Sequence, residues 1–280
     1  MGSYVISGRT ARSMLEAPEG PLRVSLDLGL SDCEVQVAHD AVLLPDGAPV
    51  SKAELRESFR DPQDCIEIVE GRCAKVYCFD PDLGRYYKLF QPHADRAPTL
   101  IIAGQTMHAI VGTDPWEDTT AKVRALECRG GACLDTCFGL GYSARLLAAA
   151  GWKPVVSCEI DPNVLRCART NPWSRGAFES KDIEIVEADA VQFVRGCPDG
   201  RFAAVFHDPP VVQLAGELYS TDFYRELARI LARRGALYHY VGTPGGRYGR
   251  DQPRNVMQRL HEAGFTATRR APRGVIARKG

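Results

Sequence analysis

The chain has 280 residues, of which 45% are hydrophobic and 25% are charged, and its 35 Lys and Arg residues balance its 35 Asp and Glu residues. This composition is typical of a folded globular protein and excludes a disordered chain, and the zero net charge argues against a broad nucleic-acid-binding surface. No segment reaches the roughly 20 apolar residues needed to cross a bilayer. The first residues lack the apolar core of a secretion signal, and the ten cysteines are scattered, so we expect a reduced, cytoplasmic protein without membrane contact.

Residues 1–114 are predicted to form a small β-rich domain. Proline, aspartate and glycine preset or tolerate the dihedral angles of tight turns, so 45–47 and 80–84 are predicted hairpin turns. The domain is a candidate substrate lid or dimer contact, which leaves homo-oligomerisation open. The β-rich runs are 22–29, 35–50, 65–79, 84–90 and 99–104.

Residues 115–280 alternate between predicted strands and helices. This alternation predicts a mainly parallel sheet with helices on both faces, in which ligands bind beyond the carboxyl ends of the strands. Asp118 or Thr119 is the expected cap of the first helix. The predicted strands are 131–136, 154–160, 183–190, 202–208, 236–241, 265–270 and 274–279, and the predicted helices are 116–128, 142–150, 162–170, 221–234 and 253–263.

A glycine-rich loop follows the first of these strands. The strand ends in Asp135, and Gly139 and Gly141 then allow a tight turn and a close ligand approach before a helix starts at Tyr142. With Ala144, the glycines also satisfy the dinucleotide-binding pattern. However, a carboxylate in the loop would repel a pyrophosphate and attract a cationic cofactor. A tight turn without a ligand is the structural alternative.

The next two strands also end in acidic residues. Glu159 lies 20 residues after Gly139 and is suited to accept hydrogen bonds from ribose hydroxyls, although it also fits the role of a cap for the following helix. Asp189-Ala190 ends the third strand, where an acidic group is suited to bind an adenine amino nitrogen. Together these positions predict a cofactor that contains adenosine.

The fourth strand ends in His207-Asp208-Pro209-Pro210. Asp208 and the carbonyl of Pro209 are suited to accept N–H bonds from an amine or amide, and the prolines stiffen the turn. His207 is a candidate proton acceptor near neutral pH, and its alternative role is a hydrogen-bonding wall. Tyr219 is expected to pack a helix onto the sheet, although it lies close to Asp208 in the chain.

The order of these motifs resembles the class I S-adenosylmethionine-dependent methyltransferases, and Ala263-Gly264-Phe265 before two strands resembles that family's C-terminal hairpin. The resemblance implies a Rossmann-like α/β fold, with a mostly parallel seven-stranded sheet that ends in an antiparallel hairpin. It also implies S-adenosylmethionine as the cofactor and catalytic roles for Asp208 and His207. The implied cofactor-binding residues are Asp135, Thr136, Gly139, Gly141, Tyr142, Glu159, Ile160, Asp189, Ala190 and Asp208.

Segments 107–119 and 207–220 are similar to a group of predicted archaeal-type methyltransferases whose substrates are poorly defined. Two residues depart from the wider family pattern. Cys137 stands where many members have a third glycine, and Val211 follows the prolines where amino-group methyltransferases have an aromatic residue that stacks on the target base. The valine argues against a stacked base as the methyl acceptor.

Three alternatives stay open. The two-domain order also resembles the spermidine-synthase-like aminopropyltransferases, which use decarboxylated S-adenosylmethionine, and a non-catalytic RNA- or protein-binding module is a further possibility. A nicotinamide-dependent dehydrogenase is the least favoured, because Asp135 and the Asp-Pro-Pro turn (208–210) have no role in one.

The acceptor itself stays open between RNA, protein and a small amine. Residues 225–280 contain 13 Lys and Arg but three Asp and Glu, which favours an anionic acceptor unless these cations simply coat helix faces. Cys128, Cys133 and Cys137 have no convincing fourth ligand, so no metal site is expected.

Overall fold

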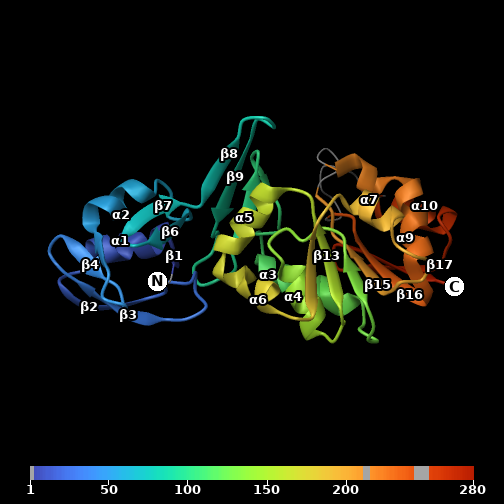
Figure 1. The fold of residues 1–280 in the computed structure, drawn as a ribbon, viewed down its shortest axis with the longest axis horizontal. Helices are drawn as coiled ribbons and strands as arrows, with labels where there is room; N and C mark the ends of the chain where they lie inside the picture. Colours follow the sequence, from blue (N-terminus) through green and yellow to red (C-terminus); the bar gives the residue numbers. More distant parts are fainter. Residues whose placement is uncertain (1–2, 211–214, 243–251) are drawn as a thin grey trace. The chain divides into compact units, whose positions relative to one another are not determined.

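The computed structural model describes residues 3–210, 215–242 and 252–280, and it divides into two compact units (Figure 1). The first unit comprises 1–116 and 163–175, and the second comprises 117–162 and 176–280. Segment 163–175 lies with the first unit, and the domain boundary at residue 114 stays a prediction. Trp173 Nε1 of this segment donates a hydrogen bond to the Leu28 carbonyl at 3.1 Å.

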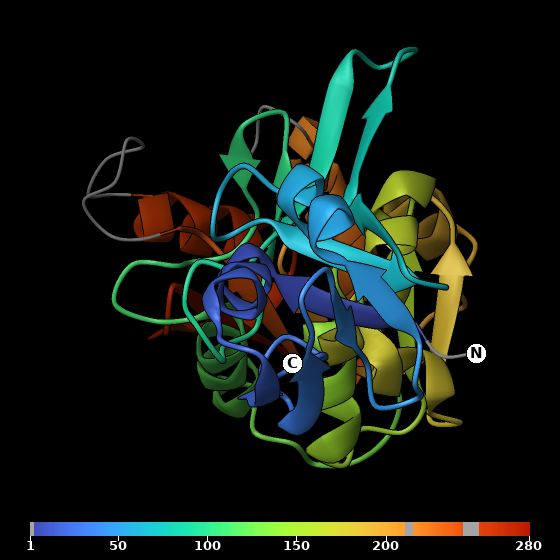
Figure 2. The same ribbon diagram turned by 90° about the vertical axis from the view of Figure 1, so that its left-hand side faces the viewer.

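The first unit is built from short antiparallel sheets and several short helices. Its elements in the first segment are β1 (Tyr4–Ser7), α1 (Gly8–Glu16), β2 (Gly20–Val24), β3 (Cys33–Val37), β4 (Ala41–Leu43), β5 (Pro49–Ser51), α2 (Lys52–Ser58), β6 (Cys65–Val69), β7 (Arg72–Lys75), β8 (Tyr77–Asp80), β9 (Arg85–Phe90), β10 (Thr99–Ile102) and β11 (Gln105–Thr106). Its second segment contains α5 (Pro162–Thr170) and η1 (Pro172–Ser174). The sheets have the orders β1-β6-β7, β2-β3-β4-β5 and β11-β10-β9-β8, and the β8–β9 hairpin extends away from the rest of the unit (Figure 2).

Two helices of the first unit, α1 and α2, were not predicted from the sequence. Helix α1 begins after Ser7, whose hydroxyl accepts the Thr10 amide hydrogen bond at 3.2 Å. Buried side chains from both helices, Met14 and Leu55 among them, join the strands in one apolar core. The helices are 9 and 7 residues long, too short to produce a convincing helical period in the sequence.

The second unit contains the seven-stranded sheet that positions the candidate site (Figure 1). Its elements are α3 (Pro115–Ala125, which begins in the first unit), β12 (Cys133–Asp135), α4 (Tyr142–Ala149), β13 (Val155–Glu159), α6 (Arg175–Glu179), β14 (Ile183–Glu187), α7 (Ala190–Arg195), β15 (Phe202–His207), η2 (Gly216–Tyr219), α9 (Thr221–Ile230), β16 (Leu231–Tyr240), α10 (Gln252–Glu262), β17 (Phe265–Ala271) and β18 (Gly274–Lys279). The strand order is β14-β13-β12-β15-β16-β18-β17, and the first five strands are parallel to one another. Strand β18 pairs antiparallel with both β16 and β17. The predicted Rossmann-like fold with a C-terminal hairpin is confirmed.

Two predicted helix boundaries were wrong. The helix predicted for 221–234 ends at Ile230, because the chain from Leu231 onward pairs with β15 as strand β16. The cap of α3 is Asp114, whose Oδ1 accepts the Trp116 amide hydrogen bond at 2.9 Å. Asp118 and Thr119, the two predicted caps, instead lie inside the helix and are buried.

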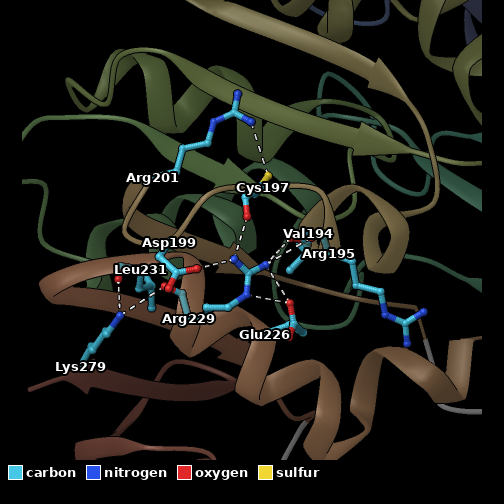
Figure 3. Close-up of polar contacts among 9 residues, drawn as sticks. All are labelled: Val194, Arg195, Cys197, Asp199, Arg201, Glu226, Arg229, Leu231 and Lys279. Atoms are coloured by element: carbon cyan, nitrogen blue, oxygen red, sulfur yellow. Dashed lines mark hydrogen bonds and ion pairs between the residues drawn. The ribbon is translucent and has the colours of Figure 1, made fainter.

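Arg229 joins several elements at the amino-terminal end of β16, the end opposite the candidate site (Figure 3). Its guanidinium donates to the carbonyls of Val194 at 2.9 Å and Cys197 at 2.7 Å, just where α7 ends. It also pairs with Glu226 and Asp199. The Cys197 amide already donates to the Val194 carbonyl at 3.1 Å, and Arg229 adds further donors to the carbonyls at this end of α7. At least this cation of the basic C-terminal segment therefore has a structural role.

Candidate functional site

Acidic or polar residues end three neighbouring strands of the seven-stranded sheet. Asp135 ends β12, Glu159 ends β13 and His207 ends β15, and β12 lies between the other two strands. Asp208 follows His207 immediately. In parallel sheets the carboxyl ends of neighbouring strands lie at one edge, so the fold brings these motifs together at the position where open α/β sheets bind ligands.

The glycine-rich loop is held in a tight turn against β13. The Phe138 amide donates to the Cys158 carbonyl, and the Gly141 amide donates to the Phe138 carbonyl, each at 2.7 Å. Gly141 adopts φ of +73°, and a Cβ atom there would lie 2.5 Å from the Phe138 ring. Both the backbone conformation and the packing therefore require glycine at 141. Gly139, at φ of +56°, is the other left-handed position of the loop.

Asp135 is fully buried beneath this loop. Its Oδ2 accepts hydrogen bonds from the hydroxyls of Ser143 at 2.7 Å and Ser157 at 2.8 Å. Its Oδ1 is buried and has no hydrogen-bond partner in the part of the chain that the structure describes. Burial raises the pKa of Asp135 to about 7, with a smaller contribution from the negative charge of Asp208. The site thus contains an acid that a bound cation would help to ionise.

Glu159 fastens the loop to the following turn. One carboxylate oxygen accepts the Gly139 amide at 2.9 Å, and the other accepts the Asp161 amide at 3.0 Å. Burial raises the pKa of Glu159 to about 7. Each carboxylate oxygen can accept two hydrogen bonds, so ribose hydroxyls would still find acceptors here. The next residue, Ile160, is apolar and yet 66% exposed.

Three further predicted cofactor residues lie at the starts of helices. Asp189 caps α7, because its Oδ1 accepts the Gln192 amide at 2.9 Å. Ala190 is the first residue of that helix and is buried, and Tyr142 is buried at the start of α4. The structure therefore assigns Asp189 a capping role that the sequence analysis did not consider.

His207 is buried, and both of its ring nitrogens are hydrogen-bonded. Nε2 lies 3.0 Å from the Leu218 carbonyl, which can only accept, so Nε2 carries the proton. Nδ1 then accepts from the Thr136 hydroxyl at 2.7 Å. Burial lowers the pKa of His207 to about 4. This geometry argues against the predicted role in proton transfer and favours the alternative of a hydrogen-bonding wall.

Asp208 belongs to a chain of ion pairs that the sequence analysis missed. Lys122 Nζ lies 2.9 Å from Asp208 Oδ2 and 2.8 Å from Asp118 Oδ2, and Arg273 Nε lies 2.6 Å from Asp118 Oδ1. The Lys122 ammonium also lies 4.6 Å from the centre of the Tyr240 ring. The available sequence signal was the spacing of Asp118 and Lys122, which places both on one face of α3. Nothing local indicated that this face would meet Asp208.

Tyr219 braces the Asp-Pro-Pro turn. Its hydroxyl donates to the Pro210 carbonyl at 2.8 Å and lies 3.4 Å from the Pro209 carbonyl. Arg259 of α10 donates in turn to the Tyr219 carbonyl. Tyr219 therefore contacts the predicted acceptor turn as well as packing its own segment, while Val211, used above to argue against a stacked base, lies outside the described residues.

Within residues 3–210, 215–242 and 252–280, no group of three or more His, Cys, Asp or Glu side chains is arranged to hold a metal ion. No helix in those ranges is both long and apolar enough to cross a membrane.

Comparisons with known proteins point to the same part of the chain. A family model described as a methyltransferase domain matches residues 134–239, which include Asp135, Glu159 and Asp208. The chain is also 35% identical over 282 residues to the uncharacterized protein MJ1233 of Methanocaldococcus jannaschii, and this match covers 98% of the chain and 95% of that protein.

Other similarities involve enzymes of polyamine synthesis. A polyamine aminopropyltransferase of Mycobacterium tuberculosis is 36% identical over 113 residues, which cover 38% of this chain but only 22% of that enzyme. Spermidine synthase in complex with the transition-state analogue AdoDATO has a TM-score of 0.58 at 21% identity, covering 70% of this chain and 71% of that one. The enzyme from Thermotoga maritima has a TM-score of 0.55 at 21% identity, with 70% of each chain covered. At these identities the structural likeness shows a shared fold.

Proposed function

The chain belongs to the family of the Methanocaldococcus jannaschii protein MJ1233 and contains an S-adenosylmethionine-dependent methyltransferase domain, and from this premise we propose that it transfers a methyl group to a nitrogen atom held at the Asp-Pro-Pro turn. The proposal rests on one observation: Asp135, Glu159 and Asp208 lie at the ends of three adjacent strands. Beside them is a glycine-rich loop whose positive φ values favour glycine.

The residues at this edge fit S-adenosylmethionine. Asp135 offers a buried carboxylate oxygen without a partner among the described residues, and a cationic ligand would favour its ionised form. Glu159 retains acceptor capacity for ribose hydroxyls. The exposed Ile160 offers an apolar surface that an adenine ring would cover.

The chemistry asks this chain mainly to bind and orient. S-adenosylmethionine supplies a methyl group on a sulfonium, which is a good leaving group. Asp208 and the Pro209 carbonyl accept the N–H bonds of the acceptor and so direct its lone pair, while Tyr219 holds the turn in place. The nitrogen–carbon bond forms as the carbon–sulfur bond breaks, and the proton released from nitrogen goes to Asp208 or to water. His207 shapes the wall of the site through its contacts with Thr136 and Leu218.

Aminopropyl transfer is the second candidate. The 36% identity to a polyamine aminopropyltransferase over 113 residues and the fold shared with spermidine synthase favour it. The same strand ends would then hold decarboxylated S-adenosylmethionine, and the acceptor would be an aliphatic amine.

Calorimetric titration distinguishes these candidates. The wild-type protein, an Asp135→Asn variant and an Asp182→Asn control are each titrated with S-adenosylmethionine, its decarboxylated form and NAD. Asp182 pairs with Lys153, which is 58% exposed, so the control makes the same chemical change away from the strand ends. We expect micromolar binding of S-adenosylmethionine that weakens by roughly tenfold or more in Asp135→Asn and stays unchanged in the control.

Each other outcome has a definite meaning. Preference for the decarboxylated form would move the assignment to aminopropyl transfer, and preference for NAD would contradict both candidates. Binding of none of the three ligands would refute the proposal and favour a non-catalytic module that keeps the fold.

A further inference from the structure

Lys122 is a buried cation fixed against the proposed acceptor turn. Only 4% of its surface is exposed, and its ammonium contacts both Asp118 and Asp208. The Tyr240 ring, 4.6 Å away, provides an electron-rich face on which the ammonium rests. Burial by itself lowers the pKa of Lys122, but the Asp208 and Asp118 carboxylates outweigh that effect, so the pKa is raised and the side chain stays charged.

Lys122 belongs to a group of opposite charges. In the part of the chain that the structure describes, Arg273 contacts Asp118 and Lys122 contacts both carboxylates, so cations and anions alternate in one connected group. Asp208 therefore does not act as an isolated negative charge at the turn. Its Oδ2 already accepts a hydrogen bond from Lys122, although the carboxylate can still accept N–H bonds from another molecule.

Resting on the proposed function, we propose that Lys122 is a specificity-determining residue that restricts the acceptor to an uncharged nitrogen, such as an amide or an aromatic amine, and excludes aliphatic ammonium groups. An ammonium at Asp208 would have to share one carboxylate with a fixed, desolvated cation. An uncharged N–H donor meets no such repulsion, because it needs only an acceptor at the right place.

The surroundings of His207 support the same acceptor class. An ammonium has no lone pair until a base removes a proton, whereas an uncharged nitrogen can attack the methyl carbon directly and lose its proton afterwards. Both His207 nitrogens are hydrogen-bonded within the protein, so His207 is not available as that base. Asp208, the carboxylate beside the turn, already forms an ion pair with Lys122.

The inference is testable without knowing the acceptor. S-adenosylmethionine carries a positive sulfonium and S-adenosylhomocysteine a neutral sulfur, so the ratio of their dissociation constants reports the charge at the reacting end of the site. Calorimetry at about pH 8 compares wild type with Lys122→Met, Lys122→Arg and a Lys153→Met control on the exposed Lys153–Asp182 pair. We expect Lys122→Met to increase the preference for the sulfonium by roughly fivefold or more, and the other two variants to match wild type. A purely structural role for Lys122 would weaken both ligands alike.

The second measurement titrates putrescine, a dication, into each protein saturated with S-adenosylhomocysteine. We expect no binding to wild type and measurable binding to Lys122→Met. Putrescine binding to wild type would overturn the inference, and this result stands even if Lys122→Met fails to fold. An unchanged sulfonium preference in folded Lys122→Met would also overturn it. Failure of wild type to bind either sulfur ligand would instead refute the proposed function, and the inference with it.

Discussion

Replacing Asp135 with asparagine is expected to make the protein more stable while weakening its cofactor binding. Asp135 is fully buried, and its pKa rises from the ordinary 3.8 to about 7 because ionisation in this position is unfavourable. The folded protein therefore keeps this proton at pH values where the unfolded chain has lost it. The unfolding free energy falls as pH rises from about 4 to about 7, and above that range the full penalty remains.

The size of the penalty follows from the pKa. A change from 3.8 to about 7, at about 1.4 kcal/mol per pH unit, corresponds to about 4 kcal/mol at alkaline pH. Asparagine removes the charge, and its carbonyl oxygen can still accept from Ser143 and Ser157, which donate to Oδ2 in the native protein. Its amide N–H groups would take the place of Oδ1, where the described residues provide no partner. A buried donor without a partner costs about 1 to 3 kcal/mol, which is less than the charge penalty that is removed, so we expect a net gain in unfolding free energy of roughly 1 to 3 kcal/mol.

Urea unfolding at about pH 5 and about pH 8 measures this difference, with Asp182→Asn as the control. The stability advantage of Asp135→Asn should grow with pH, while its affinity for S-adenosylmethionine falls. A variant less stable than wild type at the higher pH, or an advantage independent of pH, would refute the argument that a desolvated charge is stored at Asp135.

Three further outcomes follow from the second unit. The His207 ring of the folded protein should stay neutral until the pH approaches about 4. Acidification from pH 6.5 towards 4 therefore protonates this histidine in the unfolded chain first, which lowers the unfolding free energy. An NMR titration of the His207 ring with a midpoint near 6.5 would contradict this. Arg229→Met should lower the unfolding free energy measured in urea by roughly 2 to 3 kcal/mol without changing cofactor affinity. The control Arg225→Met removes an exposed ion pair and should have little effect. Equal losses of unfolding free energy in the two variants would count against a stabilising role of the helix-end contacts. Gly141→Ala should weaken cofactor binding in calorimetry far more than Gly200→Ala. Both positions have positive φ, but only at 141 would a Cβ atom collide with a ring, that of Phe138. Similar effects of the two substitutions would show that backbone strain alone matters.

The sequence determined the strand ends and the character of the loop between them. Buried strands of the second unit appear as apolar runs, and Asp135, Glu159 and Asp208 stand where those runs stop. Because parallel strands bring their carboxyl ends to one edge, strand–helix alternation was sufficient to predict that these residues would lie near one another. The short helices α1 and α2 were missed because they give too few turns for a period to emerge.

Only the tertiary structure decided what each site residue is bonded to. Lys122 and Asp208 are 86 positions apart, and no local pattern links them. No local pattern predicts the partners of His207 either, because Thr136 follows another strand and Leu218 belongs to η2. The His207 ring is neutral because the fold buries it. Residue type and position along a strand are local properties that the sequence carries. Burial, protonation and pairing depend on which distant side chains share the same small volume, and that is settled only when the sheet and its helices pack together.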